Sequence, residues 1–503
     1  MGTATSKQSF SISSYSPLQK QPETPSSPVL VEWFQASPQW TSDHKSELLS
    51  PKNNCEEPPH VPLAELLDKS SVFPVKFPIE SVRCHELITH NIPEDILERN
   101  INSVYPVIHE HALHLCATFL IHQKKFGNRD FYQNMSLLDL IDRFLSKRAV
   151  SFVGVTDHYM LLDGSEGIGG WQAVGTKDEK PPLTMETCLT YDEMRLSAFL
   201  SLSSHTVFIN DGKRYNKGIF EDDRAKLEDD GVIMGLIGPR LPSKLVMEHR
   251  DIIKTKEQNT LEQGYGNLTP PTWQGTMLEF YGDTNITYED YLPQMKTNKD
   301  RYCELFEDAY FDKLVYCRRI ALSIDTLLIE ANDRAKKMNK MAYVHVVGLG
   351  LGVWRVYCYQ DKIFMETFAQ RLELLSEVLT NISDVCFAYI AHKEAGEYKH
   401  GDKLGNIKLH MENKIGPHMK LVGEEEGKLL VVSYAWDCNA LPGNEFWFGS
   451  LHTSSDPAAA CSTQVAELHN WHINQKASAR NLRVATLEGL VTFQKYQEMH
   501  KDD

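Results

Sequence analysis

Three carboxyl groups follow one apolar run in the last quarter of the sequence. The run KLLVVSYAW leads directly into Asp437, and Glu445 and Asp456 follow shortly, with aromatic residues between them. Carboxyl groups among apolar neighbours acquire raised pKa values and can act as acid, base or stabiliser of an oxocarbenium-like centre. The stretch therefore predicts proton transfer on a sugar. The alternatives are structural: a turn at Pro442-Gly443, and an N-cap role for Asp456 before Pro457.

Side-chain amides accompany these acids. Asn439 and Asn444 lie in the same stretch, and Asn210 and Asn216 lie in the loop FINDGKRYNKG. Amides of this kind can hold the hydroxyl groups of a ribose, so all four are candidate ligand-binding residues. The acidic run at 221–223 follows that loop and is a rival catalytic position, although such runs are more often solvated surfaces.

Alternating glycines end a second apolar run, VHVVGLGLGVW. Gly348 and Gly350 would begin a dinucleotide-binding G-x-G-x-x-G motif, but Val353 stands where its third glycine belongs. The lysine and hydroxyl residue of a nucleoside-triphosphate loop are absent as well. Gly348, Gly350 and Gly352 instead predict an edge of bare backbone that can approach a diphosphate. A bulge or close packing against a neighbouring element is the alternative.

Cysteine chemistry and metal binding have weaker support. The ten cysteines are scattered without a CxxC pair or a zinc-ligand spacing, which favours free thiols in a reducing compartment. A Cys461 nucleophile with His469 or His472 is conceivable, but no orienting partner is recognisable. We expect no metal and no cofactor to be required.

The elements that must position these residues alternate between helix and strand. Amphipathic spacing predicts helices over 108–126, 135–148, 191–204, 314–340 and 364–380, and apolar runs predict strands over 205–211, 231–241, 341–348, 385–392 and 428–437. Continuous apolar strands between helices indicate an α/β fold with a parallel or mixed sheet covered on both faces. In such sheets ligands bind at the carboxyl ends of the strands, where the acids and the glycines lie.

Composition sets the outer limits. The chain has 503 residues with a net charge of −16, which argues against a general nucleic-acid binder, and it has no apolar run long enough to span a membrane. Residues 1–70 are rich in Ser, Pro and Gln and predict a disordered tail, 71–150 a helical N-terminal part, and 151–503 the catalytic core. The start MGTATS fits an acylation pattern at Gly2 and Ser6, so membrane association is expected only if Gly2 is acylated.

Several of these stretches together resemble a known family. TVFINDGKRYNKG, GVIMGLIGPRL, YVHVVGLGLGVW, YAWDCNALPGNEFW and SSDPAAAC occur in an order similar to that of the MavL-type bacterial-effector ADP-ribosylhydrolases. That family has a macrodomain-like core related to the poly(ADP-ribose) glycohydrolases. The resemblance covers roughly 152–468.

The resemblance implies a mixed sheet between helices, ADP-ribose as ligand and product, and removal of ADP-ribose from a modified protein. Arginine-linked ADP-ribosyl ubiquitin is a candidate substrate, because it is the substrate of the member that names the family. The family's acids match Asp437, Glu445 and Asp456 by context and spacing, with glutamate at 445 where an aspartate is expected. The glycines at 348, 350 and 352 would line the diphosphate.

The resemblance also implies a site of action. An effector of this family works in the cytosol of a host cell, so a cytoplasmic protein is expected. Two other functions stay open from the residues: a module that binds ADP-ribose without cleaving it, and an enzyme that uses NAD or a nucleotide sugar.

Overall fold

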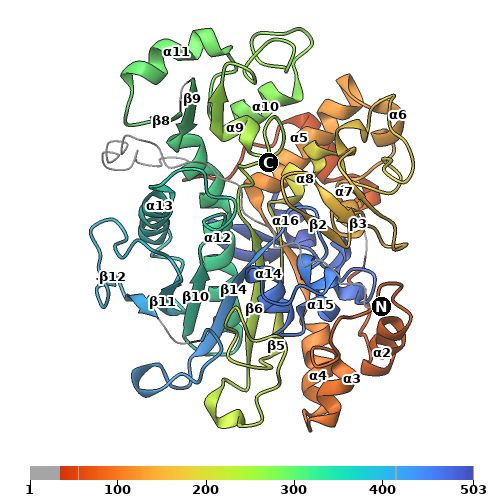
Figure 1. Cartoon of the computed structure of the whole chain (residues 1–503), viewed down its shortest axis with the longest axis vertical. Helices are drawn as coiled ribbons and strands as arrows, with labels where there is room; N and C mark the ends of the chain where they lie inside the picture. Colours follow the sequence, from red (N-terminus) through yellow and green to blue (C-terminus); the bar gives the residue numbers. More distant parts are fainter. Residues whose placement is uncertain (1–33, 55, 307, 414–415, 502–503) are drawn as a thin grey trace, which may run out of the picture.

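The computed structural model describes residues 34–54, 56–306, 308–413 and 416–501, and within them a ten-stranded mixed sheet forms the centre of the molecule (Figure 1). The strands in spatial order are β12 (Lys403–Leu404), β13 (Ile407–Asn413), β11 (Ile382–Ala388), β10 (Ala342–Val347), β14 (Leu429–Trp436), β6 (Asp230–Ile237), β5 (Leu200–Val207), β1 (Tyr105–His109), β15 (Arg483–Thr486) and β16 (Gly489–Thr492).

The middle of this sheet is parallel. β13, β11, β10, β14 and β6 run in one direction, and β5 joins β6 antiparallel. Val344 and Val431 are buried partners in this part, because strands covered on both faces hold apolar residues at consecutive positions. The predicted mixed α/β fold is confirmed. The exits of β10 and β14 lie side by side, and the glycines and carboxylates follow these two exits.

Helices cover the sheet. The longest, α12 (Lys313–Lys337), begins at the N-cap Asp312 and packs against β1, β6, β10 and β14, among others. α13 (Gln360–Leu374) packs on α12, and the short α14 (Ser455–Ala460) packs on β14. The other helices are α1 (Ser42–Leu48), α2 (Leu63–Ser71), α3 (Cys84–Thr89), α4 (Glu94–Asn102), α5 (Glu110–Phe126), α6 (Arg129–Tyr132), α7 (Leu137–Ser146), α8 (Tyr191–Ser197), α9 (His249–Ile252), α10 (Trp273–Phe280), α11 (Tyr288–Thr297), α15 (Val465–Leu468) and α16 (Phe493–Met499).

One predicted helix is half strand. The expected helix over 191–204 ends at Ser197, and β5 begins at Leu200. The segment pairs with β6 on one side and β1 on the other, and its hydroxyl groups find buried partners: Ser203 Oγ lies 2.5 Å from Glu330 Oε1. Tertiary pairing therefore outweighs the local helical pattern.

The N-terminal segment is also more ordered than its composition predicts. Residues 1–33, including Gly2 and Ser6, lie outside the described residues, but from Phe34 onward the chain packs on the fold. Phe34 is buried and its ring lies 4.2 Å from that of His111, and Trp40 donates to Tyr496 Oη at 3.1 Å. The predicted disordered tail over 1–70 is thus wrong for 34–54 and 56–70. Scattered apolar anchors fix a segment whose average composition is polar.

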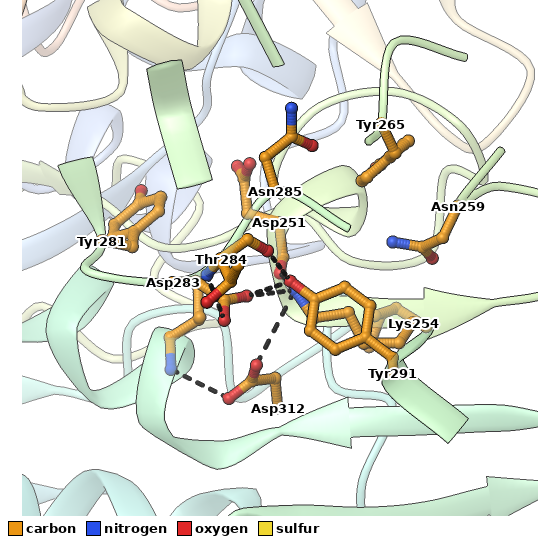
Figure 2. Close-up of polar contacts among 12 residues, drawn as sticks. Asp251, Lys254, Asn259, Tyr265, Tyr281, Asp283, Thr284, Asn285, Tyr291 and Asp312 are labelled. Atoms are coloured by element: carbon orange, nitrogen blue, oxygen red, sulfur yellow. Dashed lines mark hydrogen bonds and ion pairs between the residues drawn. The ribbon is translucent and has the colours of Figure 1, made fainter. Parts of the chain in front are cut away.

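A smaller three-stranded sheet sits at the N-terminal end of α12. Its strands are β7 (Ile253–Thr255), β9 (Ala309–Asp312) and β8 (Tyr302–Phe306). Figure 2 shows the buried Lys254 between Asp283 and Asp312, with its Nζ atom 2.8 Å from Asp283 Oδ2. Arg301 pairs with both aspartates, and Asp312 Oδ1 accepts from Val315 N at 3.2 Å. One charge network therefore joins the small sheet to α12.

A third sheet of three short strands lies beside the carboxylates. It consists of β2 (Ser151–Val153), β3 (His158–Met160) and β4 (Glu166–Ile168). No helix within the described part of the chain has both the length and the apolar character to cross a bilayer.

Candidate active site

A cavity of about 390 Å³ opens at the carboxyl ends of β10 and β14. This volume lies within the range typical of small-molecule sites. The residues that line it include Gly348, Gly350, Gly352, Trp354, Asp437, Arg214, Tyr389, His345, His418 and Ser454. The glycine exit and the first carboxylate, which are far apart in the sequence, thus meet in one cavity.

Gly350 and Gly352 lack a side chain for different reasons. Gly350 has a φ of +70°, and a Cβ atom there would lie 3.1 Å from Pro239 Cδ. From the facing loop, a Cβ atom on Gly238 would lie 2.4 Å from Gly350 N. Close loop packing, the alternative reading of the sequence, therefore accounts for Gly350. Gly352 has open space around its missing Cβ atom and lines the cavity, so its backbone is free for a ligand to approach.

Asp437 is held in place by Asn444. The Nδ2 atom of Asn444 donates to Asp437 Oδ2, and its Oδ1 atom accepts from Phe152 N at 2.8 Å. Asn444 begins a 3-10 turn (Asn444–Phe448) directly after Gly443, whose φ is +107°. The turn at Pro442-Gly443 is real, and its geometric effect is to aim an amide at the carboxylate and connect it to β2.

Glu445 and Asp456 stand behind Asp437. Asp456 is fully buried, and its Oδ1 atom accepts from Gly443 N at 2.7 Å. Glu445 lies 3.4 Å from Ser454 Oγ. The three predicted acids therefore form one cluster, of which Asp437 is the member that lines the cavity.

Burial and mutual repulsion make these carboxyl groups reluctant to ionise. Burial, together with the charge of Glu445, raises the pKa of Asp437 to about 8. Burial also raises the pKa of Glu445, and burial plus the charge of Asp437 raises the pKa of Asp456 well above its usual range. Carboxyl groups protonated near neutral pH can donate protons, which is the chemistry that the sequence predicts.

Two arginines lie near the cluster, and of these the sequence pattern indicates Arg214 but not Arg240. Arg240 is buried and pairs with Asp157 at 2.8 Å, and its charge partly offsets the raised pKa of Asp437. Arg214 lines the cavity, and its Nε atom donates to His452 O at 3.2 Å. Among the described residues that line the cavity, Arg214 is the cation placed to meet an anionic ligand, and it belongs to the FINDGKRYNKG loop that the sequence marks as a candidate binding segment.

The remaining predicted amides have backbone partners or no contact with the cavity. Asn210 Nδ2 donates to Cys461 O at 3.0 Å and Asn216 Nδ2 donates to Ala458 O at 3.1 Å, so both tie their loop to α14. Asn439 is fully buried two residues after Asp437. None of these three is among the described residues that line the cavity. Ribose binding by them stays a prediction, and the contacts of Asn210 and Asn216 describe a structural role.

The two rival catalytic candidates, Cys461 and the acidic run at 221–223, do not line this cavity in the part of the chain that the structure describes. Cys461 is buried in α14's C-cap position, and burial raises its thiol pKa to about 12, which disfavours a thiolate nucleophile. Asp222 and Asp223 are exposed, and Lys226 pairs with Glu221 at 3.1 Å. These contacts are typical of a solvated surface.

One metal-like group occurs among the described residues. Asp384, His410 and Glu425 place ligand-type atoms within 4.8 Å of one another. Lys428 Nζ lies 2.5 Å from Asp384 Oδ2, so an ammonium group already neutralises this cluster. The prediction that no metal is required stays untested.

Two buried histidines complete the cavity wall. His345 is the polar residue within the apolar strand β10, and His418 lies in the segment after β13. Both line the cavity, together with Tyr389 at its rim. The sequence reading took VHVV as a core strand and missed His345, although a lone polar residue inside a buried strand is itself a signal.

Comparison with known proteins gives one consistent result. A family model described as ADP-ribosylhydrolase MavL-like matches residues 64–499. The ADP-ribosylarginine hydrolase CG2909 of Drosophila melanogaster is 40% identical over 446 residues, which cover 85% of this chain and 87% of the fly protein. The ADP-ribosylarginine hydrolase CG3568 of the same organism is 42% identical over 439 residues, covering 82% and 84%.

Proposed function

The chain belongs to the MavL-like ADP-ribosylhydrolase family and is a hydrolase that acts on an ADP-ribosylated protein, and from this premise we propose that it cleaves the bond between ADP-ribose and an arginine side chain. The names of the two fly relatives support the arginine linkage. The observation that carries the assignment of the site is the Asp437 carboxyl group in the cavity wall, beside Glu445 and Asp456, where burial raises its pKa.

The reaction consumes one water molecule. The bond from the anomeric carbon of the distal ribose to the guanidine nitrogen breaks with its electron pair on nitrogen, and the hydroxyl group of water joins the carbon. We assign the proton for the leaving nitrogen to Asp437, and the water proton restores the carboxyl group. The charge on Glu445 keeps the proton on Asp437, and Asp456 holds Gly443 and with it the turn that carries Asn444.

The rest of the ligand follows from the cavity. The open backbone at Gly352 and the guanidinium group of Arg214 face the space that a diphosphate would fill. We propose that these two groups bind it and that no metal or other cofactor takes part. Gly348 and Gly350 shape the same loop.

Some finer predictions concern where the enzyme works and on what. Ubiquitin stays the candidate substrate to test first. An effector origin, action in a host cytosol and acylation of Gly2 likewise stay proposals, and the relatives named above are Drosophila proteins.

The test is a hydrolysis assay read by mass spectrometry on ubiquitin mono-ADP-ribosylated at arginine. Asp437→Asn, Glu445→Gln and Asp456→Asn are compared with the wild type, and Asp222→Asn is the exposed control. We expect free ADP-ribose from the wild type and the control, and a rate at least about 100-fold lower with Asp437→Asn.

Serine-linked and glutamate-linked substrates test the linkage. Release from these but not from arginine would overturn the arginine assignment. Equal rates for Asp437→Asn and the wild type would overturn the assignment of the acid. An enzyme that binds ADP-ribose but releases it from none of the substrates would be a reader.

A further inference from the structure

His345 is a buried polar side chain in the cavity wall. Its side chain is 1% exposed, and neither ring nitrogen has a partner among the residues that the structure describes. Buried polar atoms in native proteins are nearly always paired, and an unpaired one is costly. Because His345 lines the cavity, a ligand bound there can form hydrogen bonds with its ring nitrogens.

His418 is the neighbouring polar group, and its orientation is fixed. The His418 ring stacks on Phe208 with 4.2 Å between centroids. On another side, a Cβ atom on Gly212 would lie 2.7 Å from His418 Nδ1, so the loop at Gly212 presses against the ring. His418 Nδ1 lies 3.0 Å from Asn210 O, a carbonyl that can only accept. Nδ1 therefore carries the proton, and Nε2 presents a lone pair.

Both rings are uncharged at neutral pH. Burial lowers the pKa of His345 to about 4 and that of His418 to about 3. Asp211 is the charged residue that acts on the pKa of His418, and its effect is smaller than that of burial. Neutral imidazoles do not attract a phosphate group, but each offers one donor and one acceptor in fixed positions. This end of the cavity is built for a polar, uncharged, planar group.

The histidines lie at the far end of the cavity from the acid. His345 pairs in register with Val432 on β14, and Asp437 follows five residues later, about 16 Å along the strand at the usual rise. Tyr389, 63% exposed, also lines the cavity and offers it an aromatic face. With the distal ribose at Asp437, an extended ADP-ribose molecule would place its adenine base toward the histidines.

We propose that His345 and His418 read the Watson–Crick edge of the adenine base and select ADP-ribose over analogues with a 6-oxopurine. This inference rests on the proposed function, because it takes ADP-ribose to bind with its distal ribose at Asp437. The adenine amino group donates to His418 Nε2, and His345 donates to adenine N1. Hypoxanthine and guanine present a carbonyl oxygen and an N–H group at these positions, so the lone pair of His418 would face another lone pair.

The test compares two ligands by isothermal titration calorimetry. ADP-ribose and inosine diphosphate ribose differ only at the purine edge. We expect the wild type to bind ADP-ribose at least about tenfold more tightly. His345→Leu removes the donor to adenine N1 and should weaken ADP-ribose binding about tenfold with its melting temperature preserved, and His345→Gln, which keeps a donor, should restore part of the affinity. The preference for ADP-ribose should persist in both variants, because it comes from the fixed lone pair of His418 Nε2.

The outcomes separate the two proposals. Equal affinity of the wild type for both ligands overturns the base-reading inference and leaves the hydrolase proposal intact. No binding of ADP-ribose to the wild type overturns the proposed site itself. Asp437→Asn is the matched control, since it should lose hydrolysis and keep the ligand ratio. The wild-type comparison decides the question even where a variant fails to fold.

Discussion

Asp437 combines two demands at the scale of a single residue: its carboxyl group must face the ligand and must hold a proton. Asn444 aims the side chain, and burial beside Glu445 raises its pKa to about 8, against about 3.9 in an unfolded chain. A raised carboxyl pKa contributes stability that is fully present below the unfolded value and is lost as pH rises through the folded value.

The first prediction concerns Asp437→Asn. Because the variant cannot ionise at this position, its melting temperature should rise relative to the wild type as pH increases from 5 to 9, while hydrolysis is lost at every pH. Differential scanning calorimetry across this range measures the effect. Asp222→Asn, an exposed control, should keep a constant difference, and a pH-independent difference for Asp437→Asn would contradict the raised pKa.

The pH dependence of the wild-type hydrolysis rate should report the same ionisation of Asp437. If Asp437 gives a proton to the leaving nitrogen, kcat falls as pH rises through about 8. A stopped assay with arginine-linked substrate from pH 6 to 10 records this limb. A rate that continues to rise beyond pH 9 would exclude Asp437 as the proton donor.

The role of a residue could be predicted from the sequence where its side-chain type is enough to indicate the chemistry. It could not be predicted where the role depends on tertiary contacts. Asp437, Glu445 and Asp456 stood out because carboxyl groups are rare beside a buried strand. Asn444 was expected to bind ligand, whereas the structure places its amide on Asp437. His345 was missed because the cavity that it lines and the neighbouring His418 are brought to it only by the fold.

At the scale of elements, the loop after β10 depends on the loop after β6. Gly238→Ala would place a Cβ atom 2.4 Å from Gly350 N, which is backbone and cannot yield locally. We predict that this variant moves the glycine loop and weakens ADP-ribose binding at least about tenfold, with a lower melting temperature.

Gly352→Ala is its matched comparison. The added Cβ atom meets nothing within 4 Å, so the melting temperature should be unchanged. Weaker ADP-ribose binding by calorimetry at constant melting temperature would show that ligand approaches the backbone here. Unchanged affinity would remove Gly352 from the diphosphate site.

The small sheet has its own electrostatic prediction. Lys254→Met removes a fully buried ammonium group from Asp283 and Asp312, which should cost about 3–5 kcal/mol in the free energy of unfolding. Urea denaturation measures it. Lys256→Met, two residues on and exposed, should change stability by less than about 0.5 kcal/mol. Equal effects of the two substitutions would mean that the network is not stabilising.

Periodicity predicted the long elements well and the short ones poorly. α12 and β10 appeared within a few residues of their expected bounds, because a long amphipathic pattern and a continuous apolar run leave little ambiguity. β5 was mistaken in part for helix, since its serines carry no pattern of their own and are held by Glu330 and His469.

At the scale of the whole molecule, two segments that lie far apart in the chain, β1 and β15, meet in one sheet. β1 lies between β5 and β15, so a strand from the predicted helical part over 71–150 completes the sheet of the predicted core. Glu467 in α15 accepts from Cys84 N at 2.7 Å, a second link between these parts. No composition change marks such interleaving, which is why the sequence suggested a divisible chain.

This arrangement predicts the result of truncation. A protein that begins at residue 151 would expose the edges of β5 and β15 and should aggregate on expression. A protein that begins at residue 34 keeps the described contacts and should melt as the full chain does. Static light scattering and thermal melts test both, and a soluble, cooperative fragment from residue 151 would show that the core folds alone.

The place of β1 also dictates when the protein can become active during its synthesis. Because β15 (Arg483–Thr486), the parallel partner of β1, lies far along the chain from it, β15 leaves the ribosome long after β1. Until then one side of β1 stays open, and its apolar surroundings need protection from neighbouring nascent chains. We therefore expect the sheet, and with it the active hydrolase, to be complete only after β15 has been synthesised.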